Sequence, residues 1–182
     1  MRKLDALASR ADYGDRIVEV MLRLQKALDE VEAVALLEEA AERLGVDAAV
    51  FVSFMRNDPF QETYRFLLAC DPAWCSEYER RAWHADDPWL LYALGHSEPI
   101  RASELVVSWP KQRAVVELGA QFGFRSALIV PAHSGGQLKR VGVLCLGSSE
   151  PDYFDGTGYS SLRNLARSLA MELHEWLSLI HI

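Results

Sequence analysis

Residues 74–90, WCSEYERRAWHADDPWL, concentrate side chains that can do chemistry: three tryptophans, one tyrosine and two adjacent aspartates. Two carboxylates held close together separate in pKa and can act as an acid/base pair. An aspartate directly before a proline is also a natural helix N-cap, because its carboxylate accepts backbone N–H groups that the first turn leaves unpaired. Capping is the favoured interpretation of Asp86-Asp87, and it is compatible with Asp87 facing a pocket.

The aromatic residues of this segment allow two interpretations. Trp74, Tyr78, Trp83 and Trp89 can pack a helical corner against a sheet, because aromatic rings bury large areas. They can also form the wall of a ligand cavity, where a buried carboxylate needs a hydrogen-bond donor. Composition alone favours core packing.

Other catalytic or metal-binding patterns are missing from the sequence. The spacing of Cys70, Cys75 and His84 matches no common zinc motif, so we expect free thiols and no metal. Phosphate-binding glycine loops, the HExxH motif and the G-x-S-x-G elbow are all absent. We therefore expect no enzyme activity and no cofactor.

The bulk properties limit the possible partners. The chain has 182 residues, a length typical of one domain, and a net charge of -7 with no basic stripe of the kind that grips nucleic acid. The N-terminus has no apolar signal segment, and no apolar run approaches the roughly 18 residues of a membrane span. We expect a cytoplasmic protein with reduced thiols that touches neither DNA nor a membrane by itself.

The elements that must position residues 74–90 follow from hydrophobic periodicity. Two amphipathic helices are predicted near the start, with apolar stripes over residues 17–28 and 34–44 and Gly45 as the terminating residue. Further helices are predicted over 72–83, 87–96 and 110–122, and a long one over 157–181 with Asp155 or Thr157 as its cap.

Strands fill the space between the helices. Residues 46–55 and 63–69 predict one antiparallel hairpin, and residues 126–132 and 139–148 predict a second around Gly135-Gly136. Helices at both ends with strands between them predict an α+β fold, an α/β/α sandwich with a central antiparallel sheet. No repeat or linker divides residues 1–182, so we expect one domain.

The stretch DPAWCSEYERRAWHADDPWLLYALGHSEPIRASEL resembles the autoinducer-binding domain of LuxR-type quorum-sensing transcription regulators. In that family a Trp is followed four residues later by Tyr and thirteen residues later by Asp-Pro, as are Trp74, Tyr78 and Asp87-Pro88 here. The later stretch ELGAQFGFRSALIVPAHSGGQLKRVGVLCLGSSE is similar to the family's FG-containing block and its last hairpin. The resemblance covers about residues 15–178 and implies a sensor architecture like that of PAS and GAF domains.

The resemblance also implies roles for these residues. The residue aligned with Trp74 donates its indole N–H to the lactone carbonyl of an acyl-homoserine lactone, and the one aligned with Asp87 accepts the ligand amide. The residue aligned with Tyr78 lines the acyl pocket. The partner implied is therefore a small amphiphilic signal molecule.

Three usual ligand-site positions depart from the family pattern. Ala102 stands where a second Trp packs on the lactone ring, Ala127 replaces a Gly, and Cys70 replaces a Tyr that bonds the amide carbonyl. Trp89 or Trp109 are candidates to fill the space at Ala102. These departures indicate an orphan member that binds common acyl-homoserine lactones weakly.

Three functional hypotheses remain: a sensor with an altered pocket, a ligand-independent dimerisation domain with a collapsed pocket, and an acid/base enzyme using Asp86-Asp87. A continuous apolar cavity reaching Asp87 distinguishes the first two. We expect a homodimer that uses the N-terminal helices or the long last helix, whose stripe runs to Leu173, Leu177 and Ile180. The resemblance further implies that a C-terminal helix-turn-helix domain, absent from this sequence, binds DNA in the full-length regulator.

Overall fold

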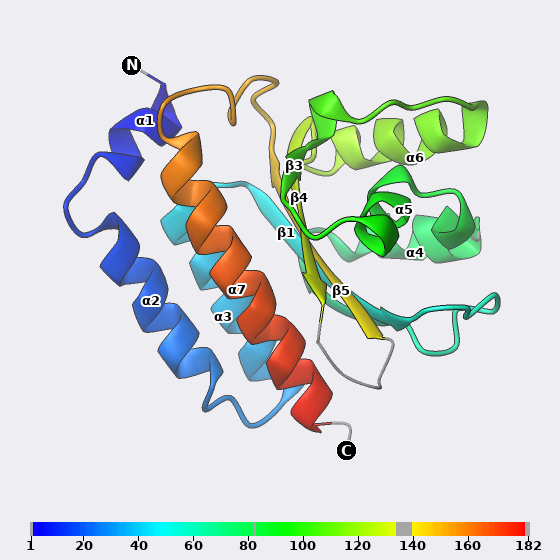
Figure 1. The fold of residues 1–182 in the computed structure, drawn as a ribbon, viewed down its shortest axis with the longest axis horizontal. Coiled ribbons are helices and arrows are strands. Elements are labelled where there is room, and N and C mark those ends of the chain that lie inside the picture. Colours follow the sequence, from blue (N-terminus) through cyan, green and yellow to red (C-terminus); the bar gives the residue numbers. More distant parts are fainter. Residues whose placement is uncertain (1, 82, 134–139, 181–182) are drawn as a thin grey trace.

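A computed structural model of the chain describes residues 2–81, 83–133 and 140–180. Its centre is a five-stranded antiparallel sheet in the order β2-β1-β5-β4-β3 (Figure 1). The strands are β1 (Ala48–Met55), β2 (Arg65–Ala69), β3 (Ile100–Arg101), β4 (Ser126–His133) and β5 (Arg140–Ser148). Both predicted hairpins are confirmed as antiparallel pairs, β1 with β2 and β4 with β5.

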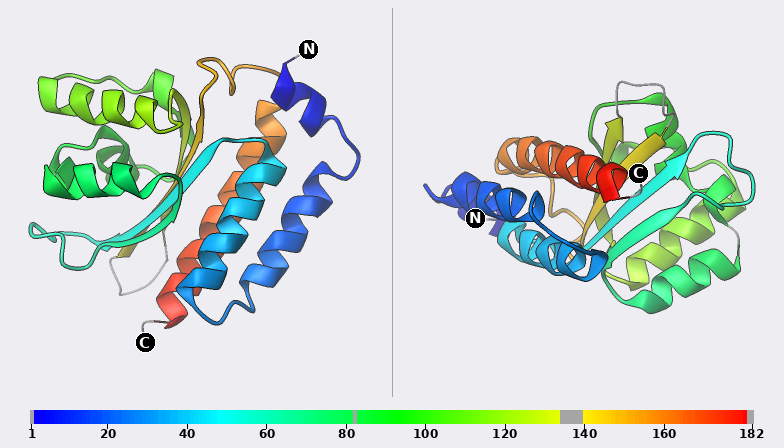
Figure 2. Two further views of the ribbon diagram at one scale, coloured as in Figure 1. Left: turned by 180° about the vertical axis from the view of Figure 1, so that it is seen from behind. Right: turned by 90° about the horizontal axis from the view of Figure 1, so that it is seen from below.

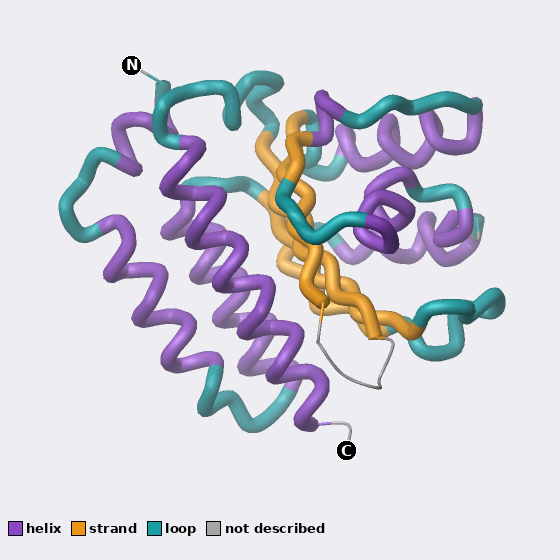
Figure 3. Tube along the Cα trace, viewed as in Figure 1, coloured by secondary structure: helices purple, strands orange, loops and turns teal. Residues whose placement is uncertain are grey.

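Helices cover both faces of the sheet. One face, which we call the bundle face, carries α1 (Lys3–Ala8), α2 (Tyr13–Leu24), α3 (Glu30–Leu44) and α7 (Tyr159–Ile180). The opposite face, the site face, carries α4 (Pro72–Arg80), α5 (Pro88–Gly95) and α6 (Pro110–Gln121), as Figures 2 and 3 show. This arrangement confirms the predicted α/β/α sandwich.

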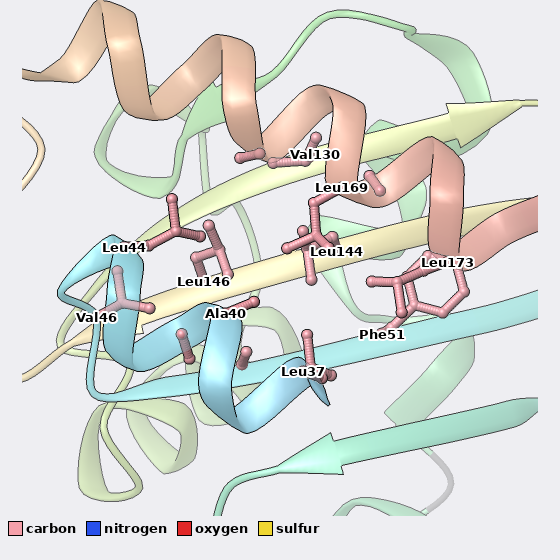
Figure 4. Packing of buried hydrophobic residues seen from close by; sticks show 14 of the residues in the cluster. Leu37, Ala40, Leu44, Val46, Phe51, Val130, Leu144, Leu146, Leu169 and Leu173 are labelled. Carbon is pink, nitrogen blue, oxygen red and sulfur yellow. The ribbon is translucent and has the colours of Figure 1, made fainter. Parts of the chain in front are cut away.

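The strands separate two hydrophobic cores because alternate side chains point to opposite faces of a sheet. In β1, Phe51 faces the bundle and Val50 and Val52 face the site. Figure 4 shows part of the bundle-face core, in which helical leucines meet the sheet: Leu37, Leu44, Leu169 and Leu173 lie with Phe51, Leu144 and Leu146.

The apolar stripe of α7 packs within the chain as far as Leu177. Leu173 and Leu177 are buried in the bundle-face core, and the indole N–H of Trp176 donates to Ala27 O at 3.0 Å. The stripe is wide because α7 packs against both the sheet and α2. Our prediction that Leu173 and Leu177 supply a dimer surface is therefore wrong.

Several local predictions also need correction. The chain opens with three helices rather than two, since α1 precedes α2, and Leu28 lies outside α2 with 84% of its surface exposed. Strand β3 is too short to leave a periodic signal. The N-terminal turn of α7 is bonded by Asp5, whose Oδ1 accepts from Gly158 N at 2.7 Å, and not by Asp155 or Thr157. The predicted Gly135-Gly136 turn lies outside the described residues.

In the described part of the chain, no helix has the length and apolar character needed to cross a membrane.

Candidate functional site

Two short helices place the residues of the 74–90 segment. Asp71 caps α4 by accepting from Ala73 N at 2.9 Å, and Pro72 fits the first turn, where no N–H is required. Trp74 and Tyr78 are four residues apart, so they share one helix face, and this face packs on the sheet. Asp87 caps α5 in the same way, with Pro88 following.

The carboxylate of Asp87 is buried, with 4% of the residue exposed. Its Oδ1 accepts from Trp89 N at 2.8 Å, and its Oδ2 accepts from the Tyr78 hydroxyl at 2.8 Å. Burial raises the pKa of Asp87 to about 6, although both hydrogen bonds act in the opposite direction. The predicted burial of Asp87 beside Trp74 and Tyr78 is confirmed.

Aromatic rings fill most of the space around this carboxylate. Ring centroids lie 5.2 Å apart for Trp74 and Tyr78, 6.2 Å for Trp74 and Phe124, and 5.9 Å for Trp89 and Phe124. A cavity of about 10 Å³ remains beside Asp87, between these rings and Val52. That volume is about the minimum that a single water molecule needs.

A second cavity of about 160 Å³ lies on the other side of Trp89 and Phe124, which line both cavities. Ala102, from the short helix Ala102–Glu104, and Ala127 of β4 contribute to its wall. We call it the Ala102 cavity. The two aromatic rings therefore act as a partition between the Ala102 cavity and the Asp87 cavity.

The indole N–H of Trp74 is an unused donor in this cluster. Trp74 is 5% exposed, yet its Nε1 makes no hydrogen bond to any residue in the described ranges. A Cβ placed on Gly119 of α6 would lie 4.0 Å from this nitrogen, so Gly119 leaves space on that side. This nitrogen is not one of the fully buried, unpartnered polar atoms of the described residues, so it keeps some access to solvent and can donate to a small molecule.

The predicted site residues divide into three groups. Trp74, Tyr78, Asp87 and Trp89 meet at the Asp87 cavity, whereas Ala102 and Ala127 line the second cavity beside Trp89. Cys70 lies at the end of β2 and lines neither cavity, so the structure does not bring it to the site.

Two aromatic residues have a different place from the one expected: Trp109 lies outside the site, and Phe124 belongs to it. Trp109, a candidate to fill the space at Ala102, is 48% exposed and lines neither cavity, while Trp89 does line the Ala102 cavity. Phe124 was missed, although its FGF context was visible in the sequence. Its importance comes from contacts with Trp74 and Trp89, which are distant in sequence.

The two aspartates have different surroundings. The Asp86 side chain is 26% exposed and forms an ion pair with Lys111 at 3.8 Å, whereas Asp87 is buried and caps α5.

The cysteines of this region are free thiols. Burial raises the pKa of the thiol of Cys70 to about 12 and that of Cys75 to about 11. Among the described residues, no three His, Cys, Asp or Glu side chains are placed to hold a metal ion.

Small-molecule sites are mostly apolar with a few placed polar groups, and the aromatic wall around the buried Asp87 carboxylate fits that description. The family model described as "Autoinducer binding domain" matches residues 29–177. The chain therefore belongs to the family of autoinducer-binding domains. Among curated proteins, no sequence match was found.

Several solved structures share the fold. CepR2 from Burkholderia cenocepacia, an N-acylhomoserine lactone dependent LuxR family transcription factor, is 20% identical, with a TM-score of 0.76 over 92% of this chain and 96% of that one. SdiA in complex with octanoyl-rac-glycerol is 16% identical, with a TM-score of 0.72 over 95% and 69%. The ligand-binding domain of VqsR from Pseudomonas aeruginosa is 16% identical, with a TM-score of 0.59 over 88% and 95%.

Proposed function

We propose that the chain is the sensing and dimerisation module of a LuxR-type regulator of quorum sensing, with a pocket altered from the usual acyl-homoserine lactone site. The observation that carries this proposal is the buried carboxylate of Asp87, which lines one small cavity together with Trp74, whose indole N–H has no partner among the described residues. A donor and an acceptor set among apolar walls suit a small amphiphilic molecule with a carbonyl and an N–H.

The altered pocket follows from the side chains around Asp87. The acyl chain of a common lactone needs far more space than about 10 Å³, so Trp89 or Phe124 must move before such a ligand enters. Ala102 offers no ring to stack on a lactone, and Cys70 offers no nearby hydroxyl. Losing one aromatic contact and one hydrogen bond weakens binding by roughly 2 to 4 kcal/mol, or about thirty- to a thousandfold.

A second candidate is a ligand-independent dimerisation domain. The small Asp87 cavity favours it, and so does the Asp87 carboxylate, because both of its oxygens already accept hydrogen bonds from the protein. In this alternative the aromatic cluster serves only to hold α4 and α5 on the sheet.

The two candidates are distinguished by thermal shift, because a ligand that binds only the native state raises its stability. The panel contains acyl-homoserine lactones and acylglycerols of graded chain length. Sensing predicts a rise in Tm for at least one compound, reduced in Trp74→Phe, which lacks the indole N–H, and kept in Trp109→Phe, whose ring lines neither cavity. A flat response across the panel from a folded dimer contradicts sensing and favours the second candidate.

The proposed homodimer uses the N-terminal helices. Val18 and Leu22 lie one turn apart on the outer surface of α2 and are exposed, and Leu28 and Val31 nearby are exposed as well. Exposed apolar side chains that lie together mark interaction surfaces. Leu22→Glu should shift the protein from dimer to monomer in light scattering, whereas Glu175→Gln on α7 should not. A wild-type monomer at high concentration would remove the dimer.

The whole regulator is part of the same proposal. Residues 1–182 form its sensing module, a C-terminal helix-turn-helix domain in the longer protein binds DNA, and the protein acts in the cytoplasm. A reducing compartment suits the three thiols, each of which is free.

A further inference from the structure

The Ala102 cavity has the size and walls of a binding site for a single ring. Its wall includes Trp89, Phe124 and Phe154 together with the small side chains of Ala102 and Ala127. A cavity of about 150 Å³ with apolar walls is large enough to bind benzene. At about 160 Å³, the Ala102 cavity fits one aromatic ring and is too small for a long acyl chain.

Two arginines lie at the rim of the Ala102 cavity, and they differ in their partners among the described residues. Arg101 is fully engaged: it donates to Phe154 O at 3.2 Å and to Glu104 at 3.1 Å, and its guanidinium lies over the Tyr159 ring. Arg125, in contrast, is exposed and makes no ion pair or hydrogen bond within the described part of the chain.

Arg125 is the cation at the rim that is free to pair with an anion. Asp155, the carboxylate that lines the cavity, lies 4.0 Å from Arg101, which is already paired with Glu104 at 3.1 Å, and Arg125 pairs with neither carboxylate. A guanidinium presents paired N–H donors that match the two oxygens of a carboxylate. Ser126 contributes no free donor, since its hydroxyl donates to Glu150 O.

We propose that the Ala102 cavity is a binding site for small aromatic carboxylates. The ring occupies the space between Trp89, Phe124 and the two alanines, and the carboxylate pairs with Arg125 at the rim. This site is separate from the Asp87 cavity and does not require that cavity to open. Because Trp89 lines both cavities and its backbone N–H is bonded to Asp87, an occupant of the Ala102 cavity contacts the same ring that closes the Asp87 site.

The test is an NMR titration of the full chain with benzoate and with its neutral analogue benzamide, following the indole N–H signal of Trp89. That signal is assigned by its loss in Trp89→Phe. Benzoate, with nine heavy atoms, should bind with a Kd on the order of 1 mM. Benzamide should bind about fivefold more weakly, because an exposed ion pair contributes modestly.

Two variants separate the ring from the charge. Arg125→Gln should remove the preference for benzoate over benzamide, while the matched control Lys111→Gln, which changes an exposed lysine outside the cavity, should keep it. Ala102→Trp, or Ala102→Leu where the larger change impairs folding, should abolish binding of both compounds by filling the cavity.

Three results would overturn the proposal: no shift of the Trp89 signal up to about 20 mM benzoate, well above the expected Kd; equal affinities for benzoate and benzamide; or benzoate binding that persists in the Ala102 variant. The proposed sensing function is tested separately, because acyl compounds that act through Trp74 can raise Tm whether or not benzoate binds. The two tests are therefore independent, and a negative result in one does not decide the other.

Discussion

The bundle face and the site face of the same sheet are packed differently. The bundle-face core consists largely of aliphatic side chains from α2, α3, α7 and the strands. The site-face core contains stacked aromatic rings, the buried carboxylate of Asp87 and two cavities. The bundle face buries mainly hydrocarbon, whereas the site face buries a carboxylate among aromatic rings and keeps space beside them.

The largest effect is expected from a cavity made in the bundle face. Leu173→Ala should lower the free energy of unfolding by about 3 to 4 kcal/mol, because Leu173 is fully buried and its neighbours collapse only partly. Urea denaturation measures the loss. The control Leu179→Ala, at a 68% exposed position of the same helix, should change stability by less than about 0.5 kcal/mol. Similar losses at both positions would contradict the assignment of the bundle face as the stabilising core.

The buried carboxylate makes the site face sensitive to pH. The folded-state pKa of Asp87, about 6, lies above the value of about 3.9 in the unfolded chain, so the folded state holds this proton more tightly. The favourable contribution is therefore complete below about pH 4 and is lost as the pH rises through about 6. Relative to Asp87→Asn, which does not titrate, the wild type should lose about 2 to 3 kcal/mol of stability between pH 4 and pH 7. Parallel stability profiles for the two proteins would contradict the burial of the charge.

A smaller loss is expected from removing the hydrogen bond to Asp87. Tyr78→Phe deletes the hydroxyl that donates to Oδ2 at 2.8 Å and should cost about 1.5 to 2 kcal/mol at pH 7. The same change should raise the pKa of Asp87 further, because a hydrogen bond to the charged form is lost. Chemical denaturation of both proteins, repeated at pH 4, measures this, and the difference should shrink when Asp87 is protonated. A difference that does not depend on pH would show that Tyr78 acts only through packing.

The same substitution on the two faces should have opposite effects. A Cβ at Gly142 would meet His174 Nδ1 and Phe51 Cζ at 2.9 Å, so Gly142→Ala should destabilise the protein by about 1 kcal/mol or more. A Cβ at Gly119 would lie 3.6 to 4.0 Å from Phe124, Trp89 and Trp74, so Gly119→Ala should be neutral or should stabilise α6 by up to about 1 kcal/mol. Differential scanning calorimetry compares the two variants. Equal destabilisation would mean that the site face has no more room than the bundle face.

Periodicity in the sequence predicted the long elements of this fold, because a buried helix or strand leaves a regular apolar pattern. It did not predict β3, which has two residues, or the cap of α7, which comes from Asp5 at the other end of the chain. The wide apolar stripe of α7 was interpreted as a dimer surface, because a sequence does not show that both the sheet and α2 pack against this helix.

The sequence of residues 74–90 predicted which side chains meet at the Asp87 cavity, but it did not predict how small that cavity is. The spacing of Trp74, Tyr78 and Asp87 placed all three at one cavity, because they lie on adjacent capped helices. That Phe124 and Trp89 close this cavity depends on contacts between α5 and the segment before β4, which no local pattern encodes.

In the proposed sensor pocket of the site face, Trp89 closes the space beside Asp87. Calorimetric titration with N-octanoyl homoserine lactone tests this claim most directly, using the wild type, Trp89→Leu and the control Trp109→Leu. The wild type and the control should show no saturation up to about 50 µM, and Trp89→Leu, which opens space beside Asp87, should bind at least tenfold more tightly than the wild type. Submicromolar binding by the wild type, or no gain in a folded Trp89→Leu protein, would contradict the claim.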